Sequence, residues 1–306
     1  MKNSYFLSIC LHPVLQKTIV LPCLRENKVN RSGEYYFDAS GKGVNVCRVL
    51  TQLKEHVLHL TQAGGRNREL FLHMLALEKI PVKWVDSFSE IRFCYTLFTK
   101  EHHTSTEIVE EAVPVGPGTE KQIMNTFLEH LPLSHTIIIS GTKAAGFSDR
   151  LYPHMVREAK KAGKLVVLDF RGDDLKNSLQ YSPDIIKPNR DEFIATFFPE
   201  QGAIPDNTVE ALEKKIMNKM MSLQRQYNVI TVLTNGSKPV LYYESNTIAR
   251  ICPPKITPLN TTGCGDAFTA GFASEFRRSR DITKAVKKGL SCGRKNALTL
   301  RPGYLR

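Results

Sequence analysis

Short runs of apolar, mostly β-branched residues recur along the chain and alternate with stretches in which apolar residues repeat every three or four positions. The apolar runs span about four to six residues without strict polar alternation, as in strands buried on both faces. They are YFLSIC (5–10), HTIIIS (135–140), KLVVLDF (164–170), DIIKPN (184–189) and NVITVLTNG (228–236). The helical stretches include residues 119–131, 148–163 and 209–226. This alternation predicts parallel βαβ crossovers and therefore a doubly wound, mostly parallel α/β sheet with helices on both faces.

Two stretches interrupt the alternation. Residues 17–38 and 92–113 have the pattern of strands and turns without intervening helices. We interpret them as a small β-sheet lid, formed by about residues 12–38 and 91–113, on a single domain that spans residues 1–306. An exposed lid is expected to pair with a second copy and form a homodimer. The apolar lid residues expected to take part are Phe93, Tyr95, Leu97 and Phe98.

The composition is that of an ordinary globular protein: of the 306 residues, 42% are hydrophobic and 24% are charged. The apolar stretch at the start is too short and interrupted for a signal peptide or a membrane span, so we expect a cytoplasmic protein with no membrane partner. Seven cysteines are scattered without a C-x-x-C pair, which argues against a zinc site and a disulfide framework. The adjacent His102 and His103 lie in a polar stretch that predicts a solvated hairpin turn.

The net charge of +12 favours anionic partners such as phosphorylated metabolites, nucleotides or nucleic acid. The basic residues are spread along the chain instead of forming a block with interleaved aromatic residues. The densest runs, RRSR at 277–280 and KAVKK at 284–288, are expected at a helix end and on an exposed helix face. We therefore expect small anionic substrates and no nucleic-acid partner.

The segment ASGKGVNVCRVL at residues 39–50 predicts a glycine turn that opens a helix. The backbone N–H groups at such a helix start bind anions, and Lys42 between Gly41 and Gly43 adds a positive charge. The spacing of glycines does not match a Walker A loop.

A second glycine turn, NTTGCGDAFTAGF at residues 260–272, also precedes a helix. Backbone N–H groups at Gly263, Cys264 and Gly265 would cradle a developing phosphate charge, and Asp266 would act as a general base for an alcohol. The alternative is that Asp266 is only the N-cap of the helix, because Asp is favoured at that position. Neither glycine cluster completes the dinucleotide-binding pattern G-x-G-x-x-G.

Three motifs occur in a fixed order over nearly the whole chain: GKGVN at 41–45, KPNRDE at 187–192 and TTGCGDAFTAGF at 261–272. Together they resemble the ribokinase-like (PfkB) carbohydrate kinases. NKVNR at 27–31 and the ending ALTLRPGYLR resemble the branch of 1-phosphofructokinase and tagatose-6-phosphate kinase. The resemblance implies a ribokinase-like fold with a β-sheet lid, and ATP-dependent phosphorylation of a hydroxyl on a sugar, most of all a ketohexose phosphate.

The resemblance also implies roles for single residues. Asp266 matches the catalytic base, and Gly263, Cys264 and Gly265 match the anion hole, with Cys264 where Ala is usual. Asn189 and Glu192 match the motif that organises Mg²⁺ and the ATP phosphates. The other matches to nucleotide-binding positions are Lys187, Thr234, Gly236 and Asn296. The matches to acceptor-binding positions are Gln16, Gly41, Lys42, Gly43, Asn45 and, for the acceptor's phosphate, Arg92.

The sugar-binding side departs from the family pattern. His12 stands in place of Asn, Gln16 in place of Asp, Cys94 in place of Asn and Thr96 in place of Lys. Two alternatives to a ketohexose-phosphate kinase therefore stay open: a kinase for a different small alcohol, and a phosphosugar or nucleotide sensor with little catalysis.

Overall fold

The computed structural model describes residues 4–200 and 209–306. The strands are β1 (Tyr5–Cys10), β2 (Val14–Leu21), β3 (Glu34–Ser40), β4 (Val57–Ala63), β5 (Val82–Asp86), β6 (Arg92–Thr99), β7 (Thr104–Val109), β8 (Ser134–Ser140), β9 (Leu165–Asp169), β10 (Ile185–Ile186), β11 (Ile230–Leu233), β12 (Val240–Glu244) and β13 (Thr247–Ile251). The helices are α1 (Lys42–Gln52), α2 (Arg68–Leu77), α3 (Thr119–His130), α4 (Leu151–Lys161), α5 (Asp173–Leu179), α6 (Arg190–Phe197), α7 (Val209–Tyr227), α8 (Cys264–Ser279) and α9 (Ile282–Ala297).

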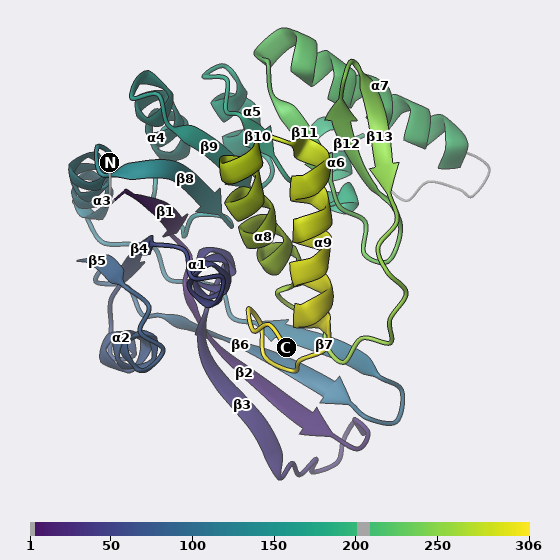
Figure 1. The fold of residues 1–306 in the computed structure, drawn as a ribbon. Coiled ribbons are helices and arrows are strands. Elements are labelled where there is room, and N and C mark those ends of the chain that lie inside the picture. The colour runs from purple at the N-terminus through teal and green to yellow at the C-terminus, as the bar shows by residue number, and fades with distance from the viewer. Residues whose placement is uncertain (1–3, 201–208) are drawn as a thin grey trace.

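Within these two ranges, nine strands form the main sheet in the order β13-β12-β11-β10-β9-β8-β1-β4-β5. The pairs from β11 through β10, β9, β8, β1 and β4 to β5 are parallel, and β12 and β13 add an antiparallel edge. Helices cover both faces of this sheet (Figure 1). The prediction of a doubly wound, mostly parallel α/β fold is confirmed.

The core lies in two layers because successive side chains of a strand point to opposite faces. In β8, Ile137 and Ile139 pack in the layer with α3 to α7, whereas Ile138 packs in the layer with α1, α2, α8 and α9. Strands buried on both faces need apolar residues at every position, which is why the strand runs in the sequence lack polar alternation.

The apolar runs in the sequence do not include strand β4, because this strand carries buried polar residues. The Nδ1 atom of His59 lies 3.0 Å from the carbonyl oxygen of Ser8. The hydroxyl of Thr61 donates to the carbonyl oxygen of Cys10 at 2.7 Å. These contacts offset part of the cost of burying the two polar side chains.

In the described part of the chain, four strands form a second, smaller sheet in the order β3-β2-β6-β7, which projects beside α1 and the C-terminus (Figure 1). Along β6, Phe93, Tyr95 and Leu97 alternate with the buried Cys94 and Thr96. Phe98 is only 3% exposed and belongs to the buried set, so the expectation that it contributes to an exposed apolar face was wrong. The tip between β6 and β7 is an exposed turn that contains His102 and His103, as predicted.

Across residues 4–200 and 209–306, no helix has the length and apolar character needed to cross a membrane.

Candidate active site

A pocket of about 550 Å³ opens beyond the carboxyl ends of the central strands. Its walls include residues that directly follow β8, β9, β10 and β11, together with the N-terminal turns of α1 and α8. At this place the order of the strands reverses. The chain passes from β1 through α1 to β4 on one side of β1, and later returns to form β8 on the other side. Ligands of open α/β sheets bind at such a switch point.

The pocket brings together most of the predicted site residues, although they come from distant parts of the sequence. Those that line it are Gln16, Gly41, Lys42, Asn45, Arg92, Lys187, Asn189, Glu192, Thr234, Gly263, Gly265 and Asp266. Gly43, Cys264, Gly236 and Asn296 are not part of its lining.

These four residues lie near the pocket walls or at the sheet edge. Asn296 is fully buried, and its side chain joins the carbonyl oxygen of Thr262 at 2.9 Å to the backbone N–H of Gly303 at 2.6 Å. It therefore braces the turn before α8. Cys264 is the first residue of α8, and Gly236 lies in the turn between β11 and β12.

Close packing explains the glycine at position 43. A Cβ atom on Gly43 would lie 2.7 Å from Cβ of Cys10 and 2.8 Å from the carbonyl oxygen of Ile9. Only glycine allows α1 to approach the end of β1 this closely. The approach places Lys42 and Asn45 at the wall of the pocket.

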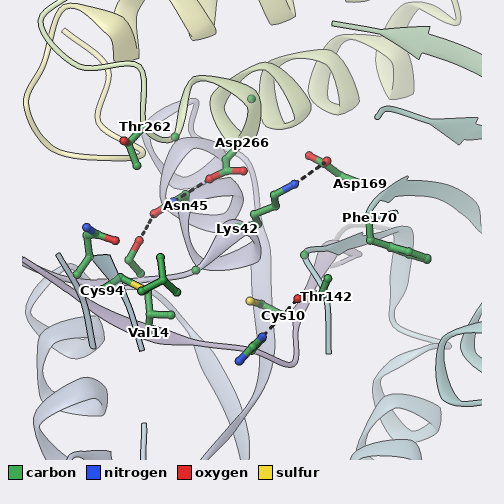
Figure 2. A pocket seen from close by; sticks show the side chains of 18 of the residues that line it. Cys10, Val14, Lys42, Asn45, Cys94, Thr142, Asp169, Phe170, Thr262 and Asp266 are labelled. Atoms are coloured by element: carbon green, nitrogen blue, oxygen red, sulfur yellow. Dashed lines mark hydrogen bonds and ion pairs between the residues drawn. The ribbon is translucent and has the colours of Figure 1, made fainter. Parts of the chain in front are cut away.

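The start of α8 tests the interpretation of Asp266 as an N-cap. The N-cap residue is Gly263, with a φ of 82°, and Asp266 lies in the first turn. The N-cap interpretation is therefore wrong. Asp266 is 7% exposed, and its Oδ2 accepts a hydrogen bond of 2.8 Å from the side-chain nitrogen of Asn45 (Figure 2).

Burial raises the pKa of Asp266 to about 7. Lys42 opposes this shift, the nearby carboxylate of Asp169 adds to it, and the bond from Asn45 opposes it. A carboxylate with a pKa near 7 is a stronger base than an ordinary Asp and still ionises near neutral pH. The site therefore holds a group suited to accept a proton from an alcohol.

A charged cluster lies near Asp266, and Figure 2 shows the side chain of Lys42 directed toward Asp169. The Lys42 ammonium lies 2.9 Å from Oε1 of Glu192 and 3.6 Å from Oδ1 of Asp169. The Lys187 ammonium lies 3.3 Å from Oδ2 of Asp169. Burial disfavours the charge on Lys42, but Asp169, Glu192 and Asp266 outweigh it and raise the pKa of this lysine.

Sequence reasoning missed Asp169 as a site residue. It is 1% exposed, and Thr269 on α8 donates a hydrogen bond to it at 2.7 Å. Burial alone would raise the pKa of Asp169, but the charges of Lys187 and Lys42 lower it, so this group stays ionised. The feature of the sequence that could have identified Asp169 is its position directly at the end of a predicted strand, in DFRGDD.

The predicted metal and phosphate motif forms a capping box at the start of α6. Oδ1 of Asn189 accepts from the backbone N–H of Glu192 at 2.7 Å, and Oε2 of Glu192 accepts from the backbone N–H of Asn189 at 2.9 Å. This fixes the carboxylate of Glu192 at the pocket wall. Among the described residues, no group of three or more His, Cys, Asp or Glu side chains is arranged to hold a metal ion.

The predicted acceptor side carries the residues that depart from the family pattern. The side-chain amide of Gln16 donates to the hydroxyl of Thr96 at 2.9 Å, so two of the departures contact each other. His12 lies 3.3 Å from the hydroxyl of Thr142. Burial and the charge of Arg92 lower the pKa of His12 to about 4, which leaves the ring neutral.

A family model described as pfkB family carbohydrate kinase matches residues 14–300. The chain belongs to the pfkB family of carbohydrate kinases. The protein is thus an ATP-dependent sugar kinase, and the resemblance read from the three motifs is confirmed.

Solved structures show the same fold at low sequence identity. The kinase is similar to phosphofructokinase-2 from Escherichia coli, with a TM-score of 0.83 and 20% identity over 97% of this chain and 93% of that one. It is similar to a possible 1-phosphofructokinase from Thermotoga maritima, with a TM-score of 0.83 and 19% identity over 98% and 94% of the two chains. Ribokinase from Thermotoga maritima gives a TM-score of 0.71 at 16% identity over 98% and 95%.

Proposed function

We propose that this kinase transfers the γ-phosphoryl group of ATP to a hydroxyl of a ketohexose phosphate, with Asp266 as the general base. The observation that carries the proposal is the position of Asp266, buried in the first turn of α8 with a raised pKa and open to the pocket. The acceptor hydroxyl gives its proton to Asp266 while its oxygen bonds to the γ-phosphorus. The bond between that phosphorus and the bridging oxygen breaks, and ADP leaves.

Charge stabilisation in this proposal comes from two sources. The backbone N–H groups of Gly263, Cys264 and Gly265 are at the positive end of α8, which stabilises a transferring phosphoryl group; that of Cys264 also donates to the carbonyl oxygen of Thr261 at 3.2 Å. The Lys42 ammonium lies between the carboxylates of Glu192 and Asp169 at the same pocket and supplies a positive charge. Its raised pKa keeps it charged at every working pH.

The residues present fit a Mg²⁺ ion that arrives with the nucleotide. Mg²⁺ keeps several waters and binds through one or two carboxylates and the phosphates of its substrate. Glu192 offers one carboxylate, oriented by the capping box, at the pocket wall. We propose that Glu192, with Asn189 holding it in place, orders the hydrated ion, which would neutralise phosphate charge when bound.

A phosphorylated acceptor is supported by Arg92. Its guanidinium lines the pocket beside His12 and Cys94, and its Nη1 donates to the backbone carbonyl oxygen of Glu110 at 2.9 Å. The Nε atom is buried without a hydrogen-bond partner among the described residues. A phosphate oxygen would satisfy such a donor. The names of the similar structures, phosphofructokinase-2 and a possible 1-phosphofructokinase, agree with this class of acceptor.

A different small alcohol is the second candidate, and the contact between Gln16 and Thr96 favours it. An Asp at position 16 would bind sugar hydroxyls with a charge, whereas the Gln16 amide is neutral and is already held by Thr96. A sensor with little catalysis is disfavoured because binding alone does not require a buried, basic carboxylate at the start of α8.

We also propose that the four-stranded sheet acts as a lid and pairs two copies of the chain. Glu107 on β7 accepts a hydrogen bond of 3.0 Å from the hydroxyl of Thr262, next to α8, so the sheet reaches across the pocket. Its outer side exposes Tyr35 (61%) and Ile108 (52%). Sedimentation of the wild type as a monomer would contradict the dimer, and a dimer lost in Tyr35→Glu would support it.

The experiment that tests the proposed function is a screen for ADP release from ATP and Mg²⁺ with a panel of acceptors. The panel contains fructose 1-phosphate, fructose 6-phosphate, tagatose 6-phosphate, the unphosphorylated sugars and small alcohols. Asp266→Asn is the matched control for contaminating kinases. Activity on a ketohexose phosphate that this variant lacks supports the proposal, whereas activity only on another acceptor favours the second candidate.

A further inference from the structure

We propose that Arg48 positions the catalytic base, because it fixes the side-chain amide of Asn45 so that an N–H, and not a carbonyl oxygen, faces Asp266. The proposal rests on the proposed role of Asp266. Asn45 and Arg48 lie three residues apart on α1 and therefore share one face of the helix. Both are almost fully buried, at 4% and 3% exposure.

The orientation of the Asn45 amide follows from the chemistry of its neighbours. Nη1 of Arg48 lies 2.8 Å from Oδ1 of Asn45, and a guanidinium can only donate. The amide oxygen must therefore face Arg48. The hydroxyl of Ser40 donates to the same oxygen at 3.1 Å. The amide nitrogen is left to face Oδ2 of Asp266 at 2.8 Å.

Arg48 is itself held rigidly. Its Nε and Nη2 atoms bind the two carboxylate oxygens of Glu78, and its Nη1 also lies 3.2 Å from the carbonyl oxygen of Pro302. The centroid of the Tyr304 ring lies 5.1 Å from the guanidinium carbon. A guanidinium fixed on several sides cannot turn away, so the amide of Asn45 has one favoured orientation.

Without Arg48, the side-chain amide of Asn45 is free to rotate by about 180° and present its oxygen to Asp266. A donor facing the carboxylate favours the ionised form, whereas an acceptor favours the protonated form. The midpoint of the Asp266 titration then moves to higher pH. The other charged or titratable groups that face Asp266 stay in place in both orientations; they are Lys42 on α1, Asp169 at the end of β9, Lys187 after β10, Cys10 on β1 and Cys264 on α8.

The test compares the wild type with Arg48→Met, which removes every donor. The Asp266 carboxyl carbon is followed by NMR in aspartate-labelled protein, and its signal is identified by its absence in Asp266→Asn. We expect the titration midpoint to rise by about one unit or more in Arg48→Met, as for the loss of one hydrogen bond to a charged group. The acid limb of kcat/KM should move by the same amount, with a roughly tenfold loss below the limb and little loss above it.

Glu78→Gln is the matched control, because it removes the ion pair of Arg48 but leaves the donor to Asn45. Its midpoint should stay at the wild-type value. If Arg48→Met does not fold, the double variant Arg48→Met/Glu78→Gln takes its place in the test, because it does not leave Glu78 as an unpaired charge. An unchanged midpoint in the Met variant, or an equal shift in Glu78→Gln, overturns the proposal. A shifted midpoint in a protein that phosphorylates no acceptor contradicts the proposed function and supports the positioning by Arg48.

Discussion

Lys42 and Glu192 form an ion pair of 2.9 Å although 150 residues separate them in the chain. Lys42 is the first residue of α1 and part of the predicted acceptor loop, and Glu192 belongs to the capping box of the predicted nucleotide motif. The pair thus joins the two halves of the pocket. Because Lys42 also lies 3.6 Å from Asp169, one ammonium balances two carboxylates where anionic phosphates are expected to bind.

Asp266→Asn should abolish phosphoryl transfer and leave the fold intact. One general base contributes about 10²- to 10⁴-fold to the rate, and Asn cannot accept the proton. The variant should also be more stable than the wild type at pH 8. Folding raises the pKa of Asp266 from 3.8 to about 7, so wild-type stability falls as pH rises through this range, by an amount on the order of 4 kcal/mol.

Turnover and thermal unfolding at pH 4 and pH 8 check this prediction together. The gain in melting temperature of Asp266→Asn should be present at pH 8 and much smaller at pH 4, where the wild-type carboxyl is protonated in the folded state and roughly half protonated in the unfolded state. Turnover close to that of the wild type would show that Asp266 is not the base.

The kinase should lose activity as pH falls below about 7. Only the ionised form of Asp266 accepts a proton, and burial raises its pKa to about 7. Lys42 does not titrate in this range because its pKa is raised above the ordinary lysine value. Therefore kcat/KM should fall about tenfold for each pH unit below the limb. A profile that is flat between pH 5 and 8 would contradict the assignment.

Gln16→Asp tests whether the acceptor pocket has changed specificity. The family pattern has Asp at position 16 and Lys at position 96, and here Gln16 binds Thr96 at 2.9 Å. The single variant places a buried carboxylate beside a neutral hydroxyl, whereas Gln16→Asp/Thr96→Lys supplies its partner charge. If the pocket is retuned for another acceptor, both variants should impair activity on that acceptor.

The matched measurement is KM for fructose 1-phosphate, fructose 6-phosphate and tagatose 6-phosphate. For a weakened ketohexose-phosphate kinase, the double variant should lower one of these KM values by about tenfold, the difference between charged and neutral hydrogen bonds. Equal KM values in wild type and both variants would show that position 16 does not contact the acceptor.

Arg92→Ala should weaken the binding of phosphorylated acceptors far more than that of their unphosphorylated forms. Arg92 lines the pocket at its predicted acceptor side, and its charge already lowers the pKa of His12. Losing one charge-assisted contact should raise KM for a phosphorylated acceptor by about tenfold or more. Steady-state kinetics on matched pairs of acceptors provide the measurement. Equal losses on both members of a pair would assign Arg92 a structural role.

Glu192→Gln should raise the Mg²⁺ concentration required for half-maximal activity. Gln at this position keeps the capping box, because its amide oxygen can still accept from the backbone N–H of Asn189. The variant therefore removes charge with little change in helix stability. Melting temperature is the control, and an unchanged Mg²⁺ dependence would argue against a role of Glu192 in ordering the metal.

The sequence alone determined the fold class and the segments that form the pocket. Apolar runs without alternation identified β1, β8, β9, β10 and β11, because a central parallel strand buries both faces. The glycine turns at positions 41–43 and 263–265 could be predicted from the sequence, because few residues other than glycine allow a helix to start in close contact with a strand or with a bound phosphate. Strand β4 was missed because it carries His59 and Thr61, whose burial depends on partners on the neighbouring strand β1.

Only the tertiary structure decided what the polar side chains do. The sequence left Asp266 as a cap or a base, and the structure excludes the cap because Gly263 is the N-cap of α8. The hydrogen-bond partner of Asp266, Asn45, is 221 residues away in the chain. Asp169 and Arg48 carried no motif, and their partners, Lys187 and the amide of Asn45, become neighbours only when the sheet and α1 come together. Local patterns record which face of an element is buried. The pKa and orientation of a side chain depend on charges and dipoles brought within a few ångströms by long-range packing.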